Sequence, residues 1–210
     1  MRSHVPPATA PLRLRRALTA YFSKWRGKPG AVRPPLPHWS EILTAFIGSC
    51  LAIGTLAAIQ YSQGTPTLTA PSLLIVASFG ASAVLLYAAP AAALSQPRNL
   101  MLGHMLSALV GVTVRILIVE RGCADHGEQC VALGAALAVA FSVALMMATG
   151  TVHPPGAASA LAAVIADENT RQLGYLFVVL PVGCGAAVML LVALLVNNAH
   201  PRLRYPTMWW

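Results

Sequence analysis

The stretch 149–167, TGTVHPPGAASALAAVIAD, combines a backbone break with small polar side chains. Pro154 and Pro155 lack a backbone donor and push the residues before them out of the helical region, so 151–154 should be extended. Proline suits the first helical position, and small helix formers follow, which predicts a helix over 155–166. We expect unpaired N–H groups in its first turn, with partial positive charge that favours an anion.

This predicted helix is too short to cross a membrane without the extended residues before it. About a dozen residues at 1.5 Å each give about 18 Å, roughly half a bilayer. Its start should therefore lie near the middle of the membrane. The polar side chains there are Thr151, His153 and Ser159. Gly156 leaves the backbone N–H groups accessible, so a bulky residue at this position should block an anion while leaving folding largely intact.

The composition is that of an integral membrane protein. Of the 210 residues, 57% are hydrophobic and 10% are charged, and the mean hydropathy is +0.67. Soluble domains carry about 25% charged residues. The first forty residues hold eight Lys or Arg and no apolar core, so we expect no signal peptide. The net charge of +8 is better explained by a retained cytoplasmic side than by nucleic-acid binding.

Composition divides the chain into three parts. Residues 1–40 form a basic cytoplasmic segment, 41–199 a transmembrane domain and 200–210 a cytoplasmic tail. Between Leu12 and Lys28, apolar residues recur at helical spacing among basic ones, which predicts an amphipathic helix on the inner leaflet. A flexible basic tail is the alternative.

The transmembrane domain is expected to be an all-α bundle of two three-element units. In the segment 71–90, the small residues of 78–83 interrupt the apolar run, and 80–89 should form a second half-helix that begins at Gly80. Each unit is then a full helix, a broken element and a full helix, and the two units are inverted repeats typical of transporters. The predicted elements are 41–61, 71–90, 98–119, 131–149, 155–166 and 172–196.

The charged residues favour six membrane crossings with both termini in the cytoplasm of a bacterial inner membrane. Six crossings put Arg98, Arg202 and Arg204 inside. They put five acidic residues outside: Glu120, Asp125, Glu128, Asp167 and Glu168. Four crossings with two re-entrant elements is the alternative, which would move 120–129 to the cytoplasm. Cys123 and Cys130 in that loop can pair if it faces an oxidising compartment, a point the sequence leaves open.

Two half-helix starts and the hydroxyl groups beside them predict an anion site near the midplane. The expected lining is Ser78, Gly80, Ser82, Thr151, His153, Gly156 and Ser159, with His104 reaching it from the third span. The six histidines lack metal-ligand spacing, so we expect neither a metal nor a cofactor. A serine hydrolase is not expected, because neither Ser82 nor Ser159 lies in a Gly-x-Ser-x-Gly motif.

Simpler structural roles remain for several of these residues. Glycine and serine in membrane helices commonly serve close packing, and Gly103, Ser107 and Gly111 form a small-residue stripe of this kind. His153 can cap its own backbone. Arg115 is expected to extend to the outer surface or to pair with Glu120.

Several blocks of the chain together resemble the HPP family of bacterial and plastid membrane proteins, named for the motif His153-Pro154-Pro155. Some members are similar to nitrite transporters of chloroplasts and cyanobacteria, and the family is usually described with four spans. The resemblance implies nitrite or a similar small anion. It runs from about residue 40 onward and rests on 79–85, 96–99, 103–104, 149–156, 197–198 and 205–206.

The sequence therefore predicts a membrane transporter or channel, not an enzyme, for a small monovalent anion, with nitrite as the first candidate. A non-transporting membrane scaffold or assembly protein is the alternative. The expected partners are a small inorganic anion and the lipid bilayer, and not nucleic acid. Assembly into a homo-oligomer is left open.

Overall fold

The computed structural model describes residues 10–26, 30, 32, 35–62, 70–122 and 127–210, and every regular element in them is helical. The chain divides into two units, residues 1–37 and 38–210. In the first, α1 (Ala10–Ser23) and a 3-10 turn (Lys24–Arg26) cover most of the predicted amphipathic helix. Its aromatic side chains Tyr21, Phe22 and Trp25 are exposed and pack edge to face. That they contact a membrane stays a prediction.

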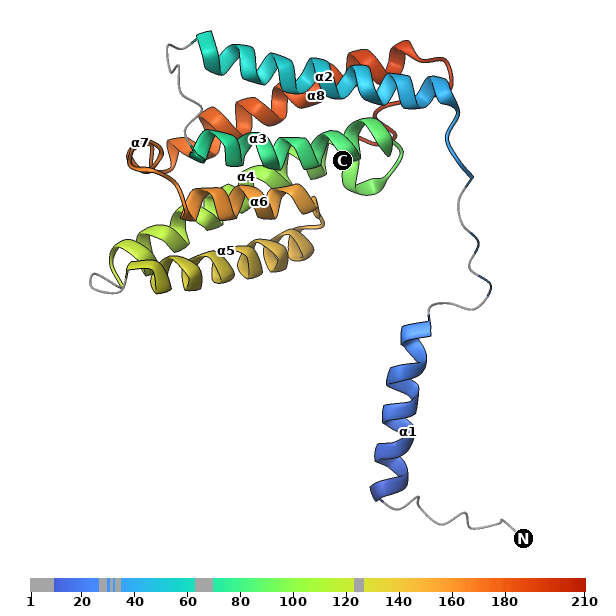
Figure 1. Ribbon diagram of the computed structural model, residues 1–210, viewed down its shortest axis with the longest axis vertical. Helices are drawn as coiled ribbons and strands as arrows, with labels where there is room; N and C mark the ends of the chain where they lie inside the picture. The colour runs from blue at the N-terminus through green and yellow to red at the C-terminus, as the bar shows by residue number, and fades with distance from the viewer. Residues whose placement is uncertain (1–9, 27–29, 31, 33–34, 63–69, 123–126) are drawn as a thin grey trace. The chain divides into compact units, whose positions relative to one another are not determined.

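The second unit is a bundle in which α6 packs against α3, α4 and α5, while α2 packs against α8 (Figure 1). Several of its helices end or begin in π-helical turns. The elements are α2 (Trp39–Ser62), α3 (Ala70–Ala83) with a π turn (Val84–Ala88), α4 (Pro97–Val114) with a π turn (Arg115–Glu120), α5 (Gly127–Thr149), α6 (Pro154–Val164), α7 (Glu168–Gln172), and a π turn (Val178–Gly183) leading into α8 (Cys184–Ala199).

Four apolar helical stretches of the described residues are long enough to cross a membrane. They are Trp39–Gln60, Pro97–Glu120, Gly127–Thr149 and Val178–Ala199. These match the four full-length spans expected from the sequence, within a few residues at each end. The protein is therefore a multi-span, all-helical membrane protein.

The predicted half-helix after the two prolines is confirmed. His153 is extended, with φ −141° and ψ 98°, and α6 begins at Pro154. The helix has 11 residues, or about 16 Å of rise. The prolines determine this start, because neither can donate a hydrogen bond to a preceding turn.

The second predicted half-helix is wrong. Gly80 lies inside α3, which begins at Ala70 and continues through the π turn to Ala88, so no helix starts there. The segment 78–83 contains no proline, and its glycine, alanines and serines are compatible with a helix. The hydroxyl oxygen of Ser82 lies 3.3 Å from the carbonyl oxygen of Ser78 one turn back, a contact that a continuous helix allows. The described residues therefore contain one half-helix, α6, and not the matching second one on which the predicted inverted repeat was built.

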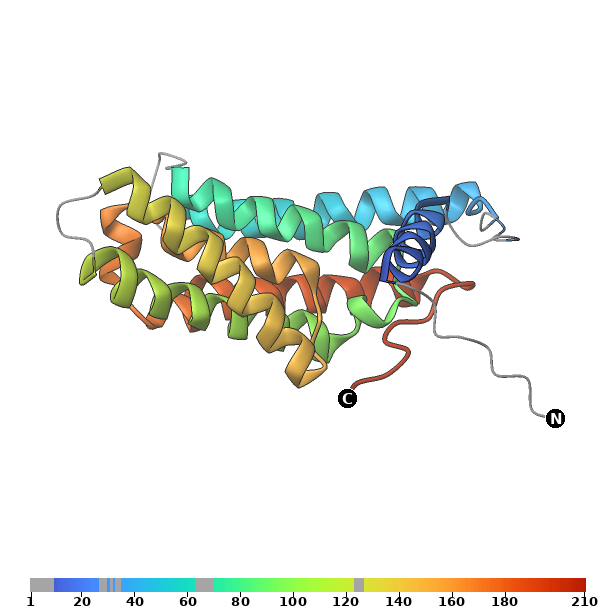
Figure 2. The same cartoon turned by 90° about the horizontal axis from the view of Figure 1, so that it is seen from below.

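The long elements of the bundle nevertheless alternate in direction. Among the described residues, α2, α3, α4, α5, α6 and α8 run back and forth, so the start of α2 and the end of α8 lie at the same end (Figures 1 and 2). This is the chain order that the six-crossing hypothesis requires. That α3 and α6 each cross the membrane stays a prediction.

The cysteines are in two states. Cys130, near the start of α5, is disulfide-bonded, whereas Cys50 and Cys184 are free. Cys123, whose pairing with Cys130 the sequence left open, lies outside the described residues.

The small-residue stripe of α4 is where α6 approaches most closely, as predicted. A Cβ on Gly111 would overlap the backbone of Ala160, and one on Gly103 would lie 2.5 Å from Cβ of His153. These glycines bring the backbones of α4 and α6 together and so determine how far the start of α6 stands from the third span.

Candidate functional site

Five polar side chains meet in the interior of the bundle. Ser78 and Ser82 come from α3, His104 from α4, His153 from the extended segment before α6, and Ser159 from α6. Each is at most 1% exposed. We call these five residues the serine–histidine cluster. All five were predicted as lining an anion site, and that they bind an anion stays a prediction.

Ser82 joins the two imidazoles. Its Oγ lies 2.7 Å from Nε2 of His104 and 2.9 Å from Nε2 of His153. The ring centroids of the two histidines are 4.9 Å apart. Phe79 packs on His104 with a centroid distance of 5.1 Å, which gives the cluster an apolar wall. A single hydroxyl therefore connects His104, which lies 22 residues away in the chain, with His153, which lies 71 residues away.

The other imidazole nitrogens are also bonded. Nδ1 of His104 lies 2.8 Å from Oγ of Ser159, and Ser159 Oγ lies 3.3 Å from Ser78 Oγ. Nδ1 of His153 lies 2.8 Å from the carbonyl oxygen of Leu94. His153 thus does not cap its own backbone, which was one expected role. It instead bonds to the short 3-10 turn Ala93–Ser95.

Residues near the start of α4 hold the extended segment in place. Nδ2 of Asn99 donates to the carbonyl of Val152 at 2.9 Å, and Arg98 donates to the carbonyl of Thr149 at 2.7 Å. Asn99 was visible in the sequence as a polar residue within a span. Leu94 gave no signal, because its contribution is a main-chain carbonyl that only the fold brings to His153.

Three predicted site residues lie outside the cluster. Gly80 is half-buried, and a Cβ there would meet nothing within 4 Å. The hydroxyl of Thr151 bonds to that of Thr149 at 2.7 Å. Gly156 packs on α4, where a Cβ would lie 2.5 Å from the carbonyl oxygen of Gly103. The expectation that a bulky residue at Gly156 would leave folding intact is therefore wrong.

The first turn of α6 also offers an anion fewer donors than expected. Pro154 and Pro155 have no N–H, and the N–H of Gly156 is already bonded to the carbonyl of His153 at 2.8 Å. The same prolines that break the chain thus remove the groups that make most helix starts attractive to anions. Any anion at this position depends on the side chains of the cluster.

No fixed charge lies on the elements that supply the cluster, apart from those of α4 and its π turn. Neither α3 nor α6 contains an ionisable residue. Within the described residues, no group of three His, Cys, Asp or Glu side chains is arranged to hold a metal ion. The cluster is therefore a hydrogen-bonded assembly whose charge is decided by the two imidazoles.

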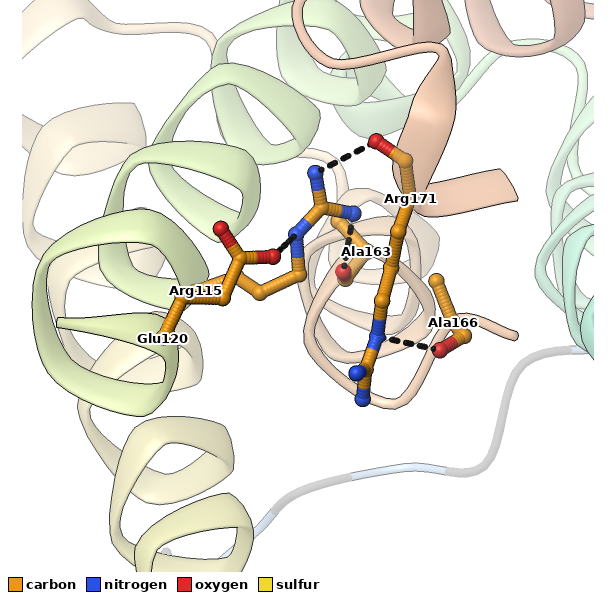
Figure 3. A network of polar contacts seen from close by, with 5 residues as sticks. All are labelled: Arg115, Glu120, Ala163, Ala166 and Arg171. Atoms are coloured by element: carbon orange, nitrogen blue, oxygen red, sulfur yellow. Dashed lines mark hydrogen bonds and ion pairs between the residues drawn. The ribbon is translucent and has the colours of Figure 1, made fainter. Parts of the chain in front are cut away.

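A second polar assembly holds the far end of α6. Arg115 is 1% exposed and donates to the carbonyls of Ala163 and Arg171 at 3.2 and 3.3 Å (Figure 3). Its Nε forms an ion pair with Glu120 at 3.1 Å, as one of the two expected roles required. Arg171 in turn donates to the carbonyl of Ala166 at 2.9 Å. Arg115 thus binds carbonyl groups near the ends of α6 and α7, and Arg171 binds a carbonyl in the link between the two helices.

Comparisons with known proteins show that the sequence is similar to a family of transmembrane proteins. The family model described as "HPP, transmembrane region" matches residues 34–206. Two transmembrane proteins of Dictyostelium discoideum are 41% and 37% identical over 190 residues, or 90% of this chain. The chain spans 63% and 57% of their lengths. No solved structure matches the chain.

Proposed function

Because the chain belongs to the HPP family of transmembrane proteins, and because its interior holds a bonded serine–histidine cluster, we propose that it moves a small monovalent anion across the membrane. The cluster is the observation that carries this proposal. Polar side chains inside a membrane domain are costly and are concentrated along ion and substrate paths.

The chemistry of the cluster favours a monovalent anion. Hydroxyl groups and imidazole N–H groups donate hydrogen bonds to an oxyanion or halide, and a protonated imidazole adds one positive charge. Removing a divalent anion from water costs far more than these groups return. Nitrite is the first candidate, because the resemblance to nitrite transporters points to it.

The direct test is anion uptake by proteoliposomes that contain the purified protein. We expect protein-dependent uptake of nitrite, and of other monovalent anions to a lesser extent, but not of sulfate. His104→Gln and His153→Gln should reduce uptake at least about tenfold, which corresponds to about 1.4 kcal/mol of barrier. His200→Gln is the matched control, since His200 bonds to Ser40 outside the cluster.

The outcomes separate transport from a purely structural role. If wild type and all three variants take up nitrite equally, the cluster serves packing and the anion follows another path. If the wild type takes up none of the anions, the non-transporting scaffold is the better account of this domain.

A hydrolase is the second candidate, because Ser82 Oγ lies within hydrogen-bond distance of an imidazole nitrogen, as a nucleophile does beside its base. Two features count against it. Ser82 is 0% exposed, and Nδ1 of both histidines bonds to a hydroxyl or carbonyl rather than to a carboxylate. A fluorophosphonate probe should leave Ser82 unmodified, and labelling lost in Ser82→Ala would favour the hydrolase.

A further inference from the structure

We propose that the two histidines of the serine–histidine cluster take up one proton together with the anion, so that transport is proton-coupled; this inference rests on the anion transport proposed above. The proton comes from the aqueous phase on one side and is released to water on the other.

When both imidazoles are neutral, one assignment of donors and acceptors satisfies all the hydrogen bonds between them and their partners. The carbonyl of Leu94 can only accept, so Nδ1 of His153 carries the hydrogen and Nε2 of His153 is an acceptor. Ser82 must then donate its one hydroxyl hydrogen to His153. It has none left for His104, so Nε2 of His104 is the donor in that 2.7 Å contact.

The tautomer of His104 in turn determines the donor in its contact with Ser159. With its hydrogen on Nε2, His104 accepts at Nδ1 from the hydroxyl of Ser159. The two neutral histidines are therefore in opposite tautomers. His104 carries its hydrogen on Nε2 and His153 carries it on Nδ1.

Ser78 supplies a second acceptor for each hydroxyl hydrogen. Its carbonyl oxygen lies 3.3 Å from Ser82 Oγ, and its Oγ lies 3.3 Å from Ser159 Oγ. A proton added to Nε2 of His153 makes both Nε2 atoms donors to Ser82, whose own hydrogen turns to the carbonyl. A proton added to Nδ1 of His104 turns the Ser159 hydrogen to the Ser78 hydroxyl. Either imidazolium thus keeps all its polar hydrogens bonded.

The pair is built to hold one proton rather than two. With ring centroids 4.9 Å apart, two imidazolium groups would repel each other in a medium of low dielectric. The proton therefore belongs to the pair, and Ser82 connects its two positions.

The surroundings of the cluster explain why the proton requires an anion. The charged groups on the elements packed around the imidazoles are Arg98, Arg115 and Glu120 of α4 with its π turn, and Glu128 at the opposite end of α5. The neutral ionisable groups there include Tyr87 in the π turn after α3, which donates to the carbonyl of Met189, and Cys184 at the start of α8. Arg98 bonds to a carbonyl, and Glu120 pairs with Arg115. Neither imidazole has a carboxylate hydrogen-bond partner in the described chain.

A lone imidazolium and a lone anion are each costly in a membrane interior, whereas a neutral pair is much less so. Each therefore raises the affinity of the cluster for the other. This linkage couples the two movements, because neither the proton nor the anion crosses readily by itself.

Nitrogen-15 NMR of histidine-labelled protein in lipid bilayers tests the hydrogen-bond directions. His104→Gln and His153→Gln identify the two signals. At about pH 8 we expect opposite tautomers, and on acidification to about pH 5 with nitrite present one proton should be added to the pair. Identical tautomers, two added protons, or none would overturn the inference.

Uptake driven by a pH gradient tests the coupling. With the membrane potential clamped at zero, one pH unit (acid outside) should drive about tenfold accumulation of nitrate or nitrite if one proton accompanies each anion. Protein-free liposomes correct for nitrous acid, which crosses lipid unaided. Ser82→Ala should abolish this accumulation. Ser142→Ala, which removes a buried hydroxyl outside the cluster, should keep it.

The two proposals fail in distinguishable ways. Protein-dependent anion flux that does not change with the pH gradient overturns the coupling but not the anion transport. Absence of protein-dependent flux for every anion overturns both.

Discussion

Ser82 contributes one hydroxyl group that satisfies two buried imidazoles at once. In a membrane interior no water replaces a lost partner, so an unbonded nitrogen or hydrogen there costs about 1–3 kcal/mol. Ser82 is 0% exposed, so solvent does not reduce this cost at its position.

We predict that Ser82→Ala lowers the stability of the folded protein by about 1–3 kcal/mol. The substitution leaves Nε2 of His104 and Nε2 of His153 without their partner. Thermal unfolding in detergent, followed by the loss of the monodisperse species, measures the change. Ser142→Ala is the control, because the Ser142 hydroxyl donates only to the carbonyl of Val139 within the same helix, α5. Equal effects of the two substitutions would contradict the prediction.

Gly156 and Gly80 are predicted to respond oppositely to alanine. At Gly156 the new Cβ meets backbone of α4, which cannot move aside, and such overpacking costs about 1–3 kcal/mol. At Gly80 the Cβ meets nothing within 4 Å, and alanine favours the helix by about 0.5–1 kcal/mol. The same unfolding measurement on both variants checks the difference in sign. A destabilised Gly80→Ala variant would show that this open face is occupied by a partner.

The helix α6 is held at both ends by other elements rather than by its own caps. At its start, Asn99 and the bond from His153 to Leu94 fix the extended segment. At its end, Arg115 binds the carbonyl of Ala163, which contributes to the partial negative charge of the helix C-terminus, and Arg171 binds the carbonyl of Ala166 just beyond it. An 11-residue helix gains little stability by itself, so these contacts decide its position.

We predict that Arg115→Met releases the far end of α6. Methionine retains much of the apolar stem but leaves the carbonyls of Ala163 and Arg171 without this donor, at a cost of about 1–3 kcal/mol. Hydrogen exchange over 161–172 should become faster. Glu120→Gln should have the smaller effect, since Glu120 is 38% exposed and an ion pair at the surface contributes little. A larger effect of Glu120→Gln would mean that the ion pair, not the carbonyl bonds, holds this end.

Most acidic residues of the described bundle lie at one of its two ends. Glu120, Glu128, Asp167 and Glu168 lie in or beside α7 and the turn between α4 and α5, together with Arg115, Arg121 and Arg171. The start of α4 and the segment after α8, which carry Arg98, Arg202 and Arg204, lie at the other end (Figure 1). Cytoplasmic loops of membrane proteins are enriched in Lys and Arg. Eight more Lys or Arg precede α2, which also begins at that other end. We propose on this basis that the end with α7 faces away from the cytoplasm and that both termini are cytoplasmic.

Labelling with an impermeant thiol reagent tests this orientation. In a chain whose free cysteines Cys50 and Cys184 are replaced by alanine, Glu128→Cys should react in intact cells of a bacterial host. Arg202→Cys should react only after lysis. Both positions are exposed, so reactivity depends on the side of the membrane. The reverse pattern would invert the orientation, and reaction of both in intact cells would rule out a common cytoplasmic side for the N- and C-terminal segments.

The sequence by itself determined the class of protein, the long spans and the position of α6. Long apolar runs with few charges fold as helices in a membrane whatever their neighbours are, and two consecutive prolines break a helix regardless of context. Polar residues inside these apolar runs are also visible locally, and five of them meet in the interior of the bundle: Ser78, Ser82, His104, His153 and Ser159.

The tertiary structure alone decided whether Gly80 begins a helix and what surrounds the start of α6. Small residues in 78–83 are compatible with either a break or a continuous helix, and packing of α3 against its neighbours selects the helix. The close approach of Gly156 to α4 and the bond from His153 to Leu94 join segments 53 and 59 residues apart. No local pattern encodes such contacts, because they depend on which backbone the folded bundle brings alongside.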